Sequence, residues 1–215
     1  MYQIGLLDLG LNQLTGTFIT EMTTLPRLSF FSLEGNLLTS NLPSEIGDFK
    51  NMSTFWISDN SFDGSIPSEM FSLHSTLTDV DVSRNKFGRT LPSEFGQLTL
   101  LNSLDVGGNR YSGTIPTELG RLSFLQLLDL SLNNLGGSIP SELGDLSELL
   151  LLDLSGNTGL EMPVPAELQL LCDKDTTCII RTRPTQAPTQ ERPRIIFDPV
   201  DPVNCNCVQR PPKGN

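Results

Sequence analysis

Seven asparagine residues recur along this chain at an almost constant interval: Asn12, Asn36, Asn60, Asn85, Asn109, Asn133 and Asn157. Successive members are 24 residues apart, except for one step of 25. The same frame returns around each of them, with apolar residues eight, five and three positions before the Asn and another two positions after it. A fixed period of this length predicts a solenoid, in which each unit buries its apolar side only against its neighbours.

Each repeat is predicted to begin with a short strand around its apolar-x-apolar pair, as at 104–106 and 152–154. Side chains alternate along a strand, so the two apolar residues point into the core and the residue between them points outward. The Asn then turns the chain. Its amide can pair with backbone groups of adjacent coils that would otherwise be buried without partners. Its recurrence predicts a continuous ladder of such hydrogen bonds.

The second half of each repeat contains an apolar-Pro-Ser/Thr-Glu segment, as at 66–69, 91–94, 115–118 and 139–142. The Ser or Thr is expected to cap one turn of helix, and exposed N–H groups favour the Glu in that first turn. Pro disfavours helix in the residue before it and so stiffens the approach to the turn. The Glu column therefore has a structural explanation, and we do not assign it to a binding site.

The charge of the repeats limits the partners that the chain can bind. Residues 1–171 hold 7 basic and 20 acidic residues, a net charge of −13, whereas the remainder carries +2. Nucleic acid binding needs clustered Lys and Arg, and an anionic membrane surface repels such an acidic array. No apolar run approaches the ~20 residues that span a bilayer, so no transmembrane segment is predicted. We expect a monomer without a cofactor or metal, and basic or neutral partners.

All four cysteines follow the repeats, at Cys172, Cys178, Cys205 and Cys207. An even number of cysteines near one terminus favours disulfides in an oxidising compartment, with the pairing left open. A metal site is the alternative, but the Cys-x-Cys spacing and the lack of a following His argue against it. The sequon at Asn51 is compatible with glycosylation in a secreted protein.

The composition divides the chain into three parts. Residues 1–171 form the solenoid, 172–180 a C-terminal cap, and 181–215 a proline-rich, mostly disordered tail. Met1 leads directly into the first repeat without a polar cap, so we expect an N-terminal leader to be missing from this sequence. These features predict a secreted or cell-surface location.

The repeated frame Leu-x-x-Leu-x-Leu-x-x-Asn-x-Leu-x-Gly-x-Ile-Pro resembles the plant-type leucine-rich repeat over residues 4–171. Such repeats occur in receptor-like proteins, receptor kinases and polygalacturonase-inhibiting proteins. The resemblance implies an α/β solenoid, a right-handed superhelix with a concave parallel sheet and seven repeats of about 24 residues. It also implies a concave face that binds proteins, peptides or hormones.

The sequence gives little support for catalysis. Its single histidine, His74, lies in the segment that lengthens one repeat rather than on a strand. A catalytic base must reach its nucleophile within hydrogen-bond distance, and nothing in the pattern predicts such a pair. We predict that the protein is not an enzyme and that His74 is a solvated loop residue.

The outward strand position carries the candidate ligand contacts. It holds Asp8, Ser32, Trp56, Asp81, Asp105, Asp129 and Asp153. Neighbouring carboxylates repel, so some of the pKa values should be raised, and the column could attract basic side chains or a cation. The alternative is that each Asp bonds only to its own turn. Trp56 is the preferred anchor because Trp contributes a large contact area, and Phe30 lies one coil away. Packing of Trp56 on its neighbours alone is the competing interpretation.

These features favour a non-catalytic recognition module with a protein or peptide ligand on its concave face, in receptor-like signalling or defence. Two alternatives remain. One is a secreted inhibitor of a cell-wall-degrading glycosidase, and the other is a structural wall or matrix component attached by its tail.

Overall fold

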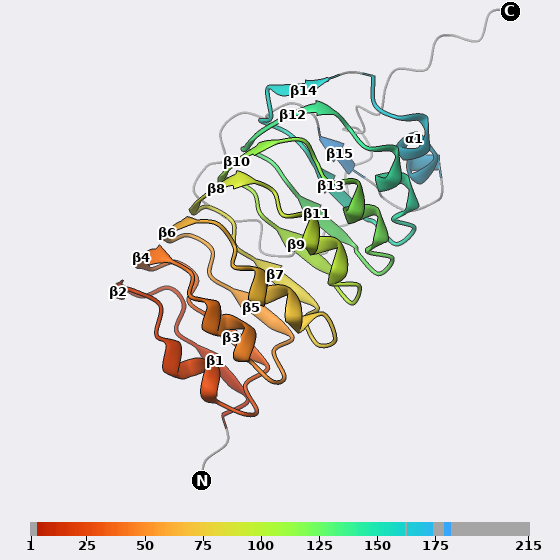
Figure 1. Ribbon diagram of the computed structural model, residues 1–215. Helices are drawn as coiled ribbons and strands as arrows, with labels where there is room; N and C mark the ends of the chain where they lie inside the picture. The colour runs from red at the N-terminus through yellow and green to blue at the C-terminus, as the bar shows by residue number, and fades with distance from the viewer. Residues whose placement is uncertain (1–3, 162, 174–178, 182–215) are drawn as a thin grey trace, which may run out of the picture.

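The computed structural model describes residues 4–161, 163–173 and 179–181. Within them, successive coils stack along one axis from the N-terminal end to the C-terminal end (Figure 1). The coils contribute strands to two parallel sheets and place short helices along one side. The predicted leucine-rich-repeat solenoid with a parallel sheet is confirmed.

The first sheet has eight strands in the order β1-β3-β5-β7-β9-β11-β13-β15. Every pairing in it is parallel, and equivalent positions of successive repeats align, as Leu104 does with Leu128. The strands β9 and β13 begin and end one residue earlier than the predicted 104–106 and 152–154, and β15 lies where no strand was predicted. The strands are β1 Leu6–Asp8, β3 Phe30–Ser32, β5 Thr54–Trp56, β7 Asp79–Asp81, β9 Ser103–Asp105, β11 Leu127–Asp129, β13 Leu151–Asp153 and β15 Ile179–Arg181.

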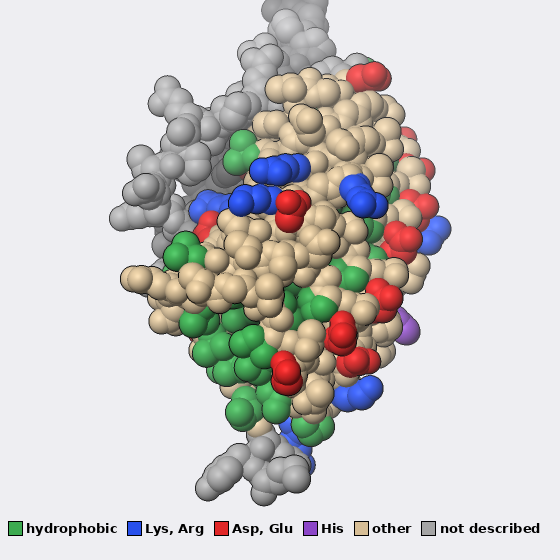
Figure 2. Space-filling view, turned by 60° about the vertical axis from the view of Figure 1, so that its left-hand side comes forward, with side chains coloured by type: hydrophobic (Ala, Val, Ile, Leu, Met, Phe, Trp, Pro, Cys, Tyr) green, Lys and Arg blue, Asp and Glu red, His purple; other side chains and the backbone are tan. Residues whose placement is uncertain are grey.

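A second parallel sheet, which the sequence did not predict, follows the asparagines. Its order is β14-β12-β10-β8-β6-β4-β2. The left-hand side of Figure 1, where β2 to β10 lie, comes forward in Figure 2. The strands are β2 Thr15–Gly16, β4 Leu37–Asn41, β6 Ser61–Gly64, β8 Lys86–Thr90, β10 Arg110–Gly113, β12 Asn134–Ser138 and β14 Gly159–Glu161.

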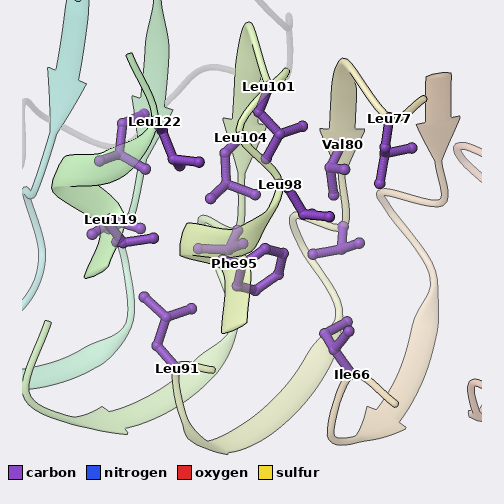
Figure 3. Packing of buried hydrophobic residues seen from close by; sticks show 14 of the residues in the cluster. Ile66, Leu77, Val80, Leu91, Phe95, Leu98, Leu101, Leu104, Leu119 and Leu122 are labelled. Carbon is purple, nitrogen blue, oxygen red and sulfur yellow. The ribbon is translucent and has the colours of Figure 1, made fainter. Parts of the chain in front are cut away.

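Apolar side chains from both sheets and from the helices fill one continuous core. Figure 3 shows this packing in the middle of the stack, where Leu98 and Leu104 lie near Phe95, and Leu101 lies farther along the same coil. All four are fully buried. Removing such side chains from water stabilises the fold by about 1.5–3 kcal/mol each. A single coil cannot bury them alone, because they are covered only when the adjacent coils stack on it.

The short helices are 3-10 helices, and the predicted Ser or Thr caps are wrong. From η2 onward the residue before each 3-10 helix is Pro, and no side chain caps it. The Ser44 hydroxyl instead donates to Glu45 at 3.2 Å. Pro already holds the extended backbone that starts the turn. The helices are η1 Thr20–Thr24, η2 Ser44–Asp48, η3 Ser68–Leu73, η4 Ser93–Gln97, η5 Thr117–Arg121 and η6 Ser141–Asp145.

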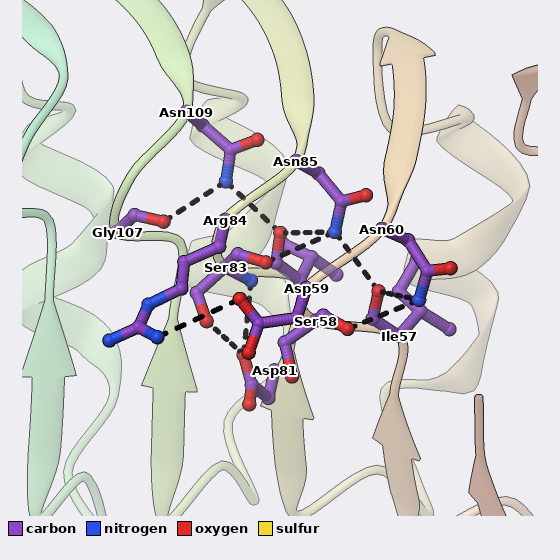
Figure 4. Close-up of polar contacts among 11 residues, drawn as sticks. Ile57, Ser58, Asp59, Asn60, Asp81, Ser83, Arg84, Asn85, Gly107 and Asn109 are labelled. Carbon is purple, nitrogen blue, oxygen red and sulfur yellow. Dashed lines mark hydrogen bonds and ion pairs between the residues drawn. The ribbon is translucent and has the colours of Figure 1, made fainter. Parts of the chain in front are cut away.

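The asparagines link each coil to its neighbour. Asn85 Nδ2 donates to the carbonyl oxygens of Val82 and Ser83 in its own coil and of Ile57 in the preceding one, at 3.2, 3.1 and 3.0 Å (Figure 4). Its Oδ1 accepts from the Phe62 N–H at 2.9 Å. The same pattern of contacts to the preceding coil recurs at Asn36, Asn60, Asn109, Asn133 and Asn157.

The C-terminal end of the described chain departs from the repeat. An α-helix, α1 Ala166–Asp173, replaces the 3-10 helix, and β15 then pairs with β13. Cys178, Cys205 and Cys207 lie outside the described residues, as does the predicted tail from 182 onward. Cys172 belongs to α1, and its side chain is not described. Among the described helices, none combines the length and apolar character needed to cross a bilayer.

Candidate functional site

Two columns of side chains point outward from the first sheet. They come from the first and third residues of each strand, because the middle residue is buried in the core in β3 through β13. The first column runs Leu6, Phe30, Thr54, Asp79, Ser103, Leu127 and Leu151, and the second runs Asp8, Ser32, Trp56, Asp81, Asp105, Asp129 and Asp153. The surface is therefore aromatic toward the N-terminal end and rich in carboxylates in the middle.

The structure brings Phe30 and Trp56 together. Their ring centroids lie 5.1 Å apart with an interplanar angle of 75°, an edge-on contact between adjacent strands β3 and β5. Both side chains remain partly exposed, whereas Ser32, the register partner of Trp56, is buried. Aromatic pairs of this geometry are held in place by their ring quadrupoles and present a rigid apolar surface. Trp56 therefore packs on a neighbour and still offers contact area.

The aspartates are tied to their own turns. Oδ1 of Asp105 accepts from the Gly107 N–H at 2.9 Å, and Oδ1 of Asp129 accepts from the Ser131 N–H at 2.8 Å. Asp81 Oδ1 accepts from the backbone N–H of Ser83 at 3.0 Å, and also from the Ser83 hydroxyl. Each carboxylate thus stabilises the turn that leads to the next Asn.

Exposure separates the predicted ligand contacts into two groups. Asp81, Asp105 and Asp129 are partly exposed, in the row between the aromatic pair and the C-terminal end. Asp153 is only 7% exposed, so it presents little surface to a ligand. Three adjacent aspartates of the predicted contacts remain partly exposed, and Asp79 of the first column adds a further partly exposed carboxylate.

Electrostatics single out Asp105. Burial raises the pKa of its carboxyl well above the usual value of 3.8, and the neighbouring carboxylates of Asp129 and Asp81 raise it further. The Gly107 N–H and the Arg84 guanidinium act in the opposite direction. A cationic group brought to this row would relieve the repulsion that the aspartates impose on one another.

Sequence reasoning did not identify an ion pair at the edge of this row. Arg84 Nη1 lies 3.7 Å from Asp59 Oδ1 (Figure 4). Burial raises the pKa of Asp59, and Arg84 opposes that shift. The sequence does hold one signal for this ion pair. Arg84 directly precedes Asn85, whereas Gly108 stands at the equivalent position of the next repeat.

The remaining predicted positions lie elsewhere. His74 is exposed at the C-terminal end of η3. Asn51 is exposed, and its Nδ2 donates to the Pro26 carbonyl oxygen at 2.7 Å. No three His, Cys, Asp or Glu side chains of the described chain form a group able to hold a metal ion.

Comparison with known proteins defines the class. Residues 76–98, 100–122 and 124–146 match the family model described as Leucine Rich Repeat. The crystal structure of a TDR receptor is similar, with a TM-score of 0.75 and 35% identity, over 81% of this chain and 31% of that chain. Comparison with curated proteins gives no match. Three repeats of the chain therefore match the Leucine Rich Repeat family, and the solenoid is consistent with a plant-type leucine-rich repeat protein.

Two further structures are similar to this chain. The Arabidopsis receptor kinase HAESA, solved with the peptide hormone IDA and the co-receptor SERK1, has a TM-score of 0.75 and 35% identity over 82% of this chain and 29% of that chain. A plant ice-binding protein has a TM-score of 0.62 and 26% identity, over 84% of this chain and 60% of that chain. This chain spans less than a third of the length of the two receptors.

Proposed function

We propose that this solenoid is a non-catalytic recognition module that binds a protein or peptide on its first sheet, as part of a receptor-like protein at the cell surface or outside the cell. The observation that carries this proposal is the partly exposed Phe30–Trp56 pair beside a row of carboxylates. One solenoid architecture serves both a peptide-hormone receptor and an ice-binding protein, so the ligand has to be argued from the side chains of this chain.

The surface favours a ligand with two kinds of side chain. An apolar group can pack against the exposed part of Trp56, since aromatic residues supply much of the binding energy at protein interfaces. A Lys or Arg can pair with the partly exposed carboxylates of Asp81 and Asp129. The acidic charge of the repeats would also steer a basic ligand toward the sheet.

The direct test is selection of short random peptides on the immobilised protein, followed by binding measurements on the enriched sequences. We expect them to combine an apolar residue with Lys or Arg. Trp56→Ala should weaken their binding by about 2 kcal/mol or more if Trp56 is the anchor. Phe124→Ala is a matched control, because Phe124 is 55% exposed but lies outside both columns.

Three results would count against the proposal. Peptides that bind Trp56→Ala as well as wild type would place the anchor elsewhere. Capture of a cell-wall glycosidase whose activity is blocked on binding would favour the inhibitor alternative, and adhesion to insoluble polysaccharide through the tail would favour the structural one.

A further inference from the structure

Three basic side chains lie together on the second sheet, and not on the first sheet, for which peptide binding is proposed above. Lys86 and Arg89 belong to β8, and Arg110 is the first residue of β10. The two strands pair directly, with Arg110 in register with Gly88. All three side chains are exposed, and Figure 2 shows Lys and Arg side chains collected on this face. We call these three residues the basic patch.

None of the three side chains forms a salt bridge with a described carboxylate, although Asp63 lies on the neighbouring strand β6. In the part of the chain that the structure describes, the one salt bridge joins Arg84 to Asp59. Asp63 is in register with Lys86, but its Oδ1 accepts from the Gly64 N–H at 2.6 Å and forms no ion pair. The strands of the second sheet hold 3 basic and 2 acidic residues, within repeats whose net charge is −13. Positive charge is thus concentrated in one place on an acidic protein.

Arg89 occupies a backbone position that suits glycine. Its φ is +69°, and the equivalent positions in the adjacent coils are Gly64 at +81° and Gly113 at +82°. A side chain with a Cβ is strained in this region, and glycine is not. The fold would therefore be more stable with glycine here. Arg89 is thus held in a strained conformation where both neighbouring coils have glycine, as Ser40 is at the same frame position of an earlier coil.

We propose that the basic patch binds a linear polysaccharide that carries carboxylate or sulfate groups. Guanidinium groups bind such planar or tetrahedral anions through paired N–H donors. The exposed hydroxyls of Thr90 and Thr114 flank the patch and can bond to sugar hydroxyls.

The surroundings of the patch favour a polysaccharide over an acidic peptide. The apolar side chains of these two strands, Phe87 and Tyr111, are completely buried, so an incoming protein would find no aromatic anchor here. The three basic side chains come from two adjacent coils and lie on the open surface of the sheet, not in an enclosed pocket. A repeating polymer can contact all of them at once, and its affinity then grows with the number of contacts.

The experiment measures binding of the full chain to immobilised dextran sulfate and alginate, with neutral dextran as the uncharged polymer. We expect binding to at least one charged polymer, loss of binding as salt is raised, and none to dextran. Comparison of dextran sulfate with alginate distinguishes recognition of sulfate groups from recognition of carboxylate groups. Lys86→Gln and Arg110→Gln should each weaken binding about two- to five-fold, the range of an exposed ionic contact.

Arg89→Gly separates binding from folding. It should weaken binding by a similar factor while raising the melting temperature, because glycine relieves the strained backbone. Ser40→Gly is the matched backbone control, since Ser40 also has a positive φ of +97° and carries no charge. Arg121→Gln is the charge control, because Arg121 is exposed on η5. Both controls should bind like wild type.

Three outcomes would overturn the proposal. The first is no binding to either charged polymer. The second is equally tight binding of polyglutamate, which would indicate an acidic protein segment as the partner. The third is an equal loss in Arg121→Gln, which would make binding a property of net charge. None of these results bears on the peptide selection, because the basic patch lies on the other sheet.

Discussion

Single asparagine side chains fix how one coil rests on the next. Asn109 Nδ2 donates to carbonyl oxygens of Val106 and Gly107 in its own coil and of Val82 in the preceding one, at 3.0, 3.3 and 3.0 Å. Its Oδ1 accepts from the Phe87 N–H at 3.0 Å. These backbone groups are buried and have no access to water that could replace the amide.

Asn109→Ala should therefore lower the free energy of unfolding by about 1–3 kcal/mol, the penalty for leaving buried polar groups unpaired. Urea denaturation measures this loss as a shift of the midpoint. Asn12→Ala is the matched control, because Asn12 is exposed and donates only to Leu9 and Gly10 within its own coil. Equal losses in the two variants would contradict a role for contacts between coils.

At the scale of the element, the 3-10 helices approach one another most closely at a glycine. A Cβ placed on Gly120 would lie 2.3 Å from the carbonyl oxygen of Glu142 in the next coil. The third helix carries Phe71 at this frame position, is six residues long, and lies within the single 25-residue step. Phe71 packs edge-on against Phe95 at 5.2 Å. The longer repeat thus accommodates a large side chain where four other coils have glycine, at Gly47, Gly96, Gly120 and Gly144.

Gly120→Ala should lower the free energy of unfolding by about 1–3 kcal/mol, because the helices must separate to admit the methyl group. Gly88→Ala adds the same group where its nearest neighbour would be 3.7 Å away. That control should change stability by no more than about 0.5 kcal/mol. Thermal unfolding of the two variants side by side distinguishes them, and a similar melting temperature for both would show that the approach of the helices is not limiting.

At the scale of the whole molecule, charge is segregated between the two sheets. The strands of the first sheet hold six aspartates and one arginine, and those of the second hold the basic patch. Stacking places the aspartates in adjacent strands, ~4.8 Å apart, so that their charges act together. The two sheets of the solenoid therefore differ in the sign of the charge that their strands carry.

This arrangement predicts how stability depends on pH. The pKa of Asp105 is raised above its usual 3.8 by burial and then by Asp129 and Asp81, so the folded protein holds this proton more tightly than the unfolded chain. The stabilisation from the proton is complete below 3.8 and is lost as the pH rises through the raised pKa.

Asp105→Asn cannot ionise and keeps an oxygen that can accept from Gly107. We therefore expect it to be more stable than wild type at neutral pH, with the difference shrinking as the pH falls toward 3.8. Melting temperatures of both proteins across this interval provide the measurement. A difference that does not change with pH would mean that Asp105 is not held with a raised pKa.

The repeating sequence by itself determined the period, the buried leucine positions, the first sheet and the place of each asparagine. This was possible because a solenoid uses local patterns, and each coil meets only its neighbours. The spacing of the aspartates also predicted raised pKa values somewhere in their column, whereas burial, the larger cause of the shift at Asp105, depends on the tertiary structure.

Only the tertiary structure decided the rest. The second sheet consists of short segments rich in Gly, Ser and Asn, which become strands because the adjacent coil supplies partners for their backbone. The low exposure of Asp153, the contact of Phe30 with Trp56 and the burial of the Tyr111 hydroxyl without a partner depend on packing between coils. The basic patch belongs here too, since residues 86 and 110 are 24 positions apart and meet only when their strands pair.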